Sequence, residues 1–83
     1  MIYAKHRHRQ ELYSYAKING SLILVGVEVI SFTRSLPSIT YQEYDLKKSH
    51  DLIKFDEITH NSLRITQEEY QAARKQAIER RNH

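Results

Sequence analysis

The sequence predicts an α+β fold, in which an antiparallel sheet of three to four strands carries one C-terminal helix packed on it. Three observations support this prediction. Asn19-Gly20 separates two strand-like segments, Leu22–Val27 is apolar except for one glycine, and the segment after residue 65 carries the signals of a helix start. With 83 residues, the chain is expected to be a single domain, residues 1–83, with a small core.

Asn19-Gly20 predicts a two-residue hairpin turn. Asn-Gly is the pair that best tolerates the positive φ angles that a type I′ turn needs at both central residues. Such a turn fixes the register, with Leu12 opposite Val27 and Tyr13 opposite Gly26. An aromatic ring can cover the gap that a strand glycine leaves. The face that carries Tyr13 is therefore expected to be half-buried or available for contact.

The remaining strand signals are weaker. Leu22–Val27 is apolar on both faces, which indicates a strand in the interior of the sheet. Pro37 cannot donate to a strand ladder and marks a break, after which Ile39–Tyr44 predicts a third strand. Leu52–Phe55 is either a short fourth strand or part of a loop. Residues 1–10 allow an extension of the first strand, a short helix or a mobile basic arm.

The C-terminal helix, Thr66–Arg81, is predicted from its ends. Thr66 with Glu69 three residues later has the spacing of a capping box. Glutamates in the first turn and arginines in the last turn suit the helix dipole. A narrow apolar stripe is expected to pack on the sheet, and its residues are Tyr70, Ala73, Ala77 and Ile78.

The charge is unevenly distributed along the chain. Residues 1–20 have a net charge of +3, residues 21–60 of −2 and residues 61–83 of +2, which together give the formal +3. Two basic ends thus flank an acidic middle, and the first end concentrates its charge in Lys5–Arg9. Clustered cations near tyrosine rings are suited to a polyanion.

We therefore expect a small non-catalytic binding protein that acts on nucleic acid, or on a nucleoprotein complex, through a basic surface containing tyrosines. Basic side chains would contact phosphates with release of counterions, and tyrosine rings would stack on splayed bases. The expected contact residues are Lys5, Arg7, Arg9, Tyr13, Tyr15, Arg74 and Lys75.

Two other function classes stay open. The first is a protein-binding inhibitor or adaptor of a larger machine, of the mobile-element or anti-defence type, for which six tyrosines would supply contact area. The second is a metal-independent ribonuclease-like toxin that uses histidine in acid–base chemistry. The spacing ties no nucleophile to a base and an orienting group, so we expect no enzyme activity and no catalytic residue.

We expect neither a metal nor a cofactor. His6 and His8 would share one strand face, but zinc usually needs at least a third protein ligand. The absence of cysteine excludes disulfides, and for a chain of this size a homodimer is one substitute. No apolar stretch approaches the roughly 20 residues of a membrane span, so we expect a cytoplasmic protein without a membrane partner.

Overall fold

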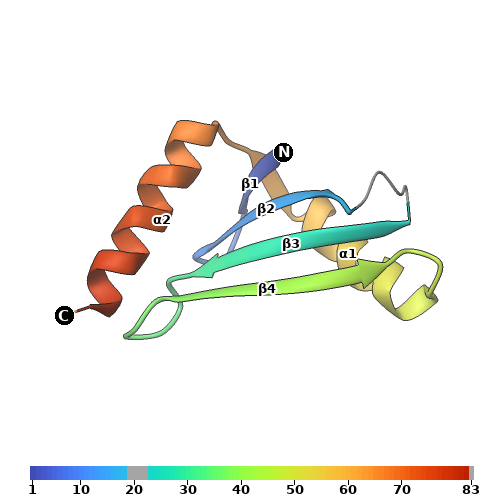
Figure 1. The fold of residues 1–83 in the computed structure, drawn as a ribbon, viewed down its shortest axis with the longest axis horizontal. Coiled ribbons are helices and arrows are strands. Elements are labelled where there is room, and N and C mark those ends of the chain that lie inside the picture. Colours follow the sequence, from blue (N-terminus) through green and yellow to red (C-terminus); the bar gives the residue numbers. More distant parts are fainter. Residues whose placement is uncertain (19–22, 83) are drawn as a thin grey trace.

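The computed structural model describes residues 1–18 and 23–82. In these residues, a five-stranded antiparallel sheet carries one helix on each face (Figure 1). The elements are β1 (Ile2–His6), β2 (Glu11–Lys17), β3 (Leu24–Ser31), β4 (Ser38–Asp45), α1 (Ser49–His60), β5 (Ser62–Arg64) and α2 (Gln67–Arg81). The predicted α+β class is confirmed, but the sheet is larger than predicted and a second helix is present.

The strand order is β4-β3-β2-β1-β5. The first four strands form an antiparallel meander, and α1 then carries the chain from the β4 edge to the opposite edge, where β5 pairs with β1. Because neighbouring strands alternate in direction, the β1–β2 turn and the β3–β4 loop lie at the same end of the sheet (Figure 1).

The predicted hairpin register is wrong. Leu12 lies opposite Ile30 rather than Val27, a shift of three residues along β3. An odd shift exchanges the faces of the sheet, so Leu12 and Val27 belong to different faces instead of sharing one. The turn at Asn19-Gly20, from which the register was predicted, lies outside the described residues.

An aromatic ring does cover the glycine of β3, but it comes from another strand. Tyr13 lies opposite Val29, not opposite Gly26. The side chain of Tyr41 in β4 lies over Gly26 instead. A Cβ atom built on this glycine would overlap the Tyr41 hydroxyl and come within 2.9 Å of its Cζ.

Leu52–Phe55 lies in helix α1, so the prediction of a strand or loop is wrong. The helix gives little sequence signal. Its N-cap residue, Lys48, makes no side-chain cap, and Ile53 is 66 % exposed. Phe55 and Ile58 pack on the sheet and attach the helix to it.

Residues 1–10 form a strand and a turn. Strand β1 folds back on β2 and lies between β2 and β5, so it is a separate strand and not an extension of the first predicted one. Neither a helix nor a free arm forms there. Residues 7–10 make the turn that joins the two strands.

The C-terminal helix has the predicted start. Thr66 is the N-cap and accepts a hydrogen bond from the backbone of Glu69 at 3.1 Å, and both halves of the capping box form. Tyr70 and Ala77 are buried as predicted, whereas Ile78 is 40 % exposed and lies outside the contact stripe.

Each face of the sheet has its own core. Helix α2 covers one face, whose buried residues are Leu12, Ile30, Tyr70 and Ala77. Helix α1 covers the other face, whose buried residues are Tyr13, Val25, Val27 and Tyr44. The two helices therefore stabilise the sheet from opposite sides.

Candidate functional site

The topology brings arginines from three separate segments to one end of the molecule. These segments are the β1–β2 turn, the β3–β4 loop and the last turn of α2 (Figure 1). Phe32 donates its backbone N–H to the Gln10 carbonyl at 2.8 Å, and the Arg80 guanidinium lies 5.6 Å from the centre of the Phe32 ring. The arginine end, as we call this surface, consists of Arg7, Arg9, Arg34, Arg80 and Arg81.

All five side chains of the arginine end are exposed. Arg9 forms an ion pair with Glu11 at 2.9 Å. The other four arginines have no ion pair within the described residues. The acids within or directly next to these three segments are Glu11 and Glu79, so five arginines and two carboxylates give this end of the molecule a net positive charge.

His6 holds the β1–β2 turn in place. Its Nδ1 accepts backbone hydrogen bonds from His8 at 3.0 Å and from Arg9 at 2.9 Å. His6 is 8 % exposed, and burial, helped by the nearby Arg9 charge, lowers the pKa of its imidazole. Because only an unprotonated Nδ1 can accept, the turn requires the neutral ring. Arg7 adds a backbone hydrogen bond to the Asn61 carbonyl at 2.8 Å.

Arg9 is oriented by a second polar group. Oε1 of Glu11 accepts from Arg9 Nε at 2.9 Å and from the Tyr13 hydroxyl at 2.8 Å. Tyr13 is 2 % exposed, and burial raises the pKa of Tyr13 to about 12. Its ring belongs to the core and is not on the surface, so Tyr13 supports the turn through its hydroxyl and offers no face to a base.

The structure separates the other residues predicted as contacts. Lys5 lies on the α2 side of the sheet, whereas Tyr15 is half-buried on the α1 side with its ring 5.3 Å from that of Phe55. Arg74 is engaged by an acid of β3, and Lys75 is exposed on α2. Of the predicted set, only Arg7 and Arg9 belong to the arginine end.

The acid that engages Arg74 is Glu28. Arg74 Nε lies 3.0 Å from Oε1 of Glu28, and the hydroxyl of buried Tyr70 donates to the same oxygen at 2.7 Å. Burial alone would raise the pKa of Glu28, but the hydrogen bonds from Arg74 and Tyr70 and the Arg74 charge hold it below its usual value. Burial raises the pKa of Tyr70. The hydrogen bonds of Tyr70 and Arg74 to Glu28 thus link α2 to β3.

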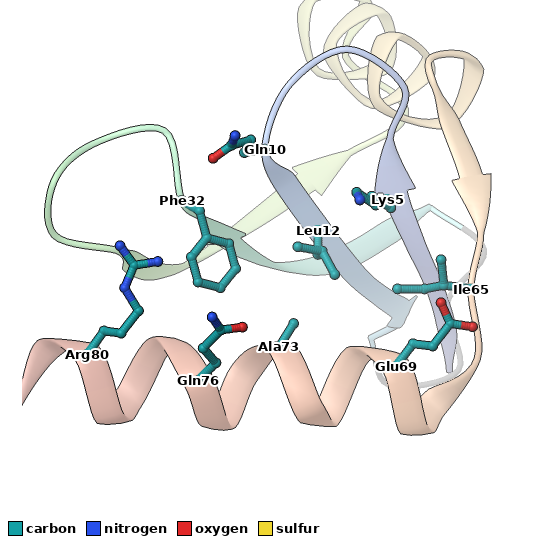
Figure 2. A pocket seen from close by; sticks show the side chains of 9 residues that line it. All are labelled: Lys5, Gln10, Leu12, Phe32, Ile65, Glu69, Ala73, Gln76 and Arg80. Atoms are coloured by element: carbon teal, nitrogen blue, oxygen red, sulfur yellow. The ribbon is translucent and has the colours of Figure 1, made fainter.

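A groove of about 460 Å³ runs between α2 and the β1–β2 hairpin (Figure 2). Its apolar lining consists of Leu12, Phe32, Ile65 and Ala73. Its polar lining consists of Lys5, Gln10, Glu69, Gln76 and Arg80. Arg80 and Phe32 lie at one end of the groove and Lys5 at the other (Figure 2). Because Arg80 also belongs to the arginine end, the two surfaces are continuous.

Sequence reasoning missed Phe32 and Arg34 of the β3–β4 loop and Arg80 and Arg81 of the last turn of α2. Both segments are far in sequence from the basic cluster Lys5–Arg9. The strand order and the packing of α2 on the sheet place them together. Without that order, the sequence offers no signal that the basic residues of the chain's two ends share a surface.

Comparison of the chain with protein-family models, with curated proteins and with solved structures finds no match. Across residues 1–18 and 23–82, no three histidine, aspartate or glutamate side chains are grouped so that they could hold a metal ion. In the same residues, no helix has the length and apolar character needed to cross a membrane.

Proposed function

We propose that this protein binds nucleic acid, alone or in a nucleoprotein complex, through the arginine end. The observation that supports the proposal is the convergence of exposed arginines from three segments, four of them without an internal ion pair among the described residues. Guanidinium groups match phosphate oxygens in two-point hydrogen bonds. Neutralising several phosphates releases counterions, which supplies sequence-independent affinity.

The rigidity of the β1–β2 turn supports this proposal. His6 fixes the backbone that carries Arg9, and Glu11 fixes the direction of the Arg9 side chain. Groups that are already ordered lose less conformational entropy when a ligand binds. The turn is therefore suited to hold Arg7 and Arg9 toward a phosphate backbone.

Binding without catalysis remains our proposal. His6 uses its Nδ1 to bond the turn, and its protonation would break those bonds. A ribonuclease-like mechanism would need a histidine that can both take up and release a proton near the scissile phosphate. His6 is therefore better explained as a support for the turn than as an acid–base group.

The test is a salt titration of binding to one labelled oligonucleotide. Arg7→Ala combined with Arg34→Ala should lower the slope of log affinity against log salt by about 1.5, because two phosphate contacts are lost. The control is Lys47→Ala combined with Lys54→Ala, which removes the same charge from exposed residues outside the arginine end. No binding by the wild type at about 50 mM salt, or an equal effect of both double variants, would refute the proposal.

The outer edge of β4 supports a second candidate, a protein-binding inhibitor or adaptor. No described strand pairs with this edge. Leu46 donates its backbone N–H to the Ile23 carbonyl at 2.8 Å, and from this bond every second residue of β4 is bonded to β3. The backbone groups that face away from β3 belong to Ile39, Tyr41 and Glu43. Tyr41 is also 60 % exposed, so the edge can accept an extended segment of another protein.

Glu43→Pro tests this second candidate, because it removes an outward N–H and leaves the ladder with β3 in place. The measurement is retention of a protein from nuclease-treated native lysate by wild-type and variant baits. A partner retained by the wild type and lost with Glu43→Pro would favour the β4 edge. A partner retained equally by both baits would exclude the edge as its binding surface. Light scattering of the pure protein would show whether a second copy occupies the edge instead.

A further inference from the structure

We propose that the groove between α2 and the β1–β2 hairpin receives one unpaired nucleobase of a single strand whose backbone lies on the arginine end. This inference rests on the proposed function and adds the form of the nucleic acid, which is single-stranded at the groove. The groove combines an apolar floor, two side-chain amides and a cation near each end.

The size and floor of the groove fit a base. Its volume of about 460 Å³ falls within the range of about 300–1,000 Å³ that small-ligand sites occupy. The floor contains the Phe32 ring, with the Arg80 guanidinium over it and Leu12 and Ala73 beside it. A base can stack on an aromatic ring or on a guanidinium plane.

Two amide side chains can bond the edge of such a base. Gln10 lies on the hairpin wall of the groove and Gln76 on the α2 wall (Figure 2). Neither side-chain amide has a hydrogen-bond partner among the described residues. An amide presents both a donor and an acceptor, as the edges of nucleobases do. The walls can therefore satisfy the polar edge of a base whose faces contact the apolar floor.

The charges at the two ends of the groove suit the flanking phosphates. Arg80 lies at the end that joins the arginine end, and Lys5 lies at the other end, where Glu69 also lines the groove (Figure 2). The Glu69 carboxylate is engaged by the backbone N–H and the hydroxyl of Thr66 in the capping box. A nucleotide seated in the groove thus has a cation on each side. The bases of a duplex are stacked and paired, so they cannot enter without being flipped out. The geometry therefore favours a single strand over a duplex.

The experiment compares one labelled oligonucleotide, single-stranded and as a blunt duplex, at one salt concentration. A fluorescent adenine analogue in the strand reports stacking. For the wild type we expect tighter binding of the single strand and a change in emission. Phe32→Leu should weaken single-strand binding about tenfold without changing the salt slope, because stacking releases no counterions. Phe55→Leu makes the same change on the α1 face and should leave single-strand binding unaltered.

Gln76→Ala provides a second variant that does not disturb the core, because Gln76 is exposed on α2. It should weaken single-strand binding severalfold and leave duplex binding unchanged. Equal affinity of the wild type for both forms, with no change in emission and no effect of either groove variant, would overturn the groove inference and leave the arginine end intact. Absence of binding to both forms would instead refute the proposed function itself.

Discussion

The hydroxyl of Tyr70 lies 2.7 Å from Oε1 of Glu28, across 42 positions of sequence. This bond joins the buried face of α2 to the centre of β3. Arg74, one turn further along the helix, forms an ion pair with the same carboxylate. Tyr70 also contacts the Tyr3 ring of β1, with ring centres 5.1 Å apart. Tyr70 therefore contributes, with Arg74 and buried Ala77, to holding α2 on the sheet.

Tyr70→Phe should therefore destabilise the protein by about 1–2 kcal/mol, because it removes a hydrogen bond to a charged acceptor. Chemical denaturation measures the free energy of unfolding. Tyr41→Phe is the matched control, because the exposed Tyr41 hydroxyl has no hydrogen-bond partner in the described part of the chain. Equal stability of the two variants would show that the Glu28 bond contributes nothing measurable.

The His6 contacts predict a loss of stability in mildly acidic solution. The folded-state pKa of His6 is lowered from 6.5, so folding favours the neutral ring. The stabilisation is present above pH 6.5 and is lost as the pH falls through the folded-state pKa. His6→Asn offers an uncharged acceptor to the same backbone N–H groups and should abolish this part of the pH dependence. Thermal unfolding from pH 8 to pH 5 is the measurement, and an unchanged profile in His6→Asn would contradict the assignment.

Glu28 predicts a second loss at lower pH. Its folded-state pKa lies below the usual 4.5, so its stabilisation is present above pH 4.5 and disappears as the carboxylate is protonated through its folded-state pKa. Glu28→Gln should flatten the stability profile in this acidic range and lower the stability at neutral pH. If Glu28→Gln loses stability with acid as steeply as the wild type, another carboxylate is responsible.

The helix cap gives a prediction that does not depend on pH in the neutral range. Thr66→Ala should cost about 1 kcal/mol, because the amide of Glu69 loses its side-chain acceptor. Thr66→Ser keeps the acceptor oxygen and should retain most of the stability. Denaturant titrations of the two variants measure the difference, and a Thr66→Ser variant as unstable as Thr66→Ala would rule out the cap as the cause.

Gly26→Ala should have different effects in two backgrounds. In the wild type, the new Cβ displaces the Tyr41 ring, so the substitution is neutral or destabilising by up to about 1 kcal/mol. With Tyr41→Ala, the obstruction is absent, and alanine should stabilise the strand by about 0.5 kcal/mol relative to glycine. A double-mutant cycle tests this pair, and additive effects would show that the ring and the glycine are independent.

The parts of the fold that were predicted carry local signals. The capping residues Thr66 and Glu69 indicate the start of helix α2, and Pro37 immediately precedes β4. Helix α1 has no such cap, and much of its apolar surface is exposed, so its residues resemble a strand or loop. The hairpin register failed for a different reason, because it was inferred from the turn alone. Burial of Tyr13 and Val27 on one face determines the register of β2 and β3.

The candidate site was predicted only in part, because only some of its residues are close together in the sequence. Arg7 and Arg9 are neighbours in sequence and form a visible cluster. The groove and the arginine end combine that cluster with Phe32, Arg34 and Arg80, which the strand order and the packing of α2 on the sheet bring near. Likewise, nothing in the sequence indicated that Glu28 would engage Arg74, and Tyr13, whose face was expected to be half-buried or available for contact, is fully buried.

The hydrogen bond between Arg7 and the Asn61 carbonyl, together with the pairing of β5 with β1, has a consequence for the order of folding. The meander β1–β4 consists of contacts between neighbouring strands, which close short loops. Pairing of β5 with β1 closes a loop that contains the whole meander and α1, so its entropic cost is larger and it should form late. The support that Asn61 gives to the β1–β2 turn therefore depends on a late event. A chain truncated before β5 would retain the sequence of the meander but could not form the β1–β5 pairing. In the full chain, protection of the Arg7 amide from hydrogen exchange should show when this pairing forms.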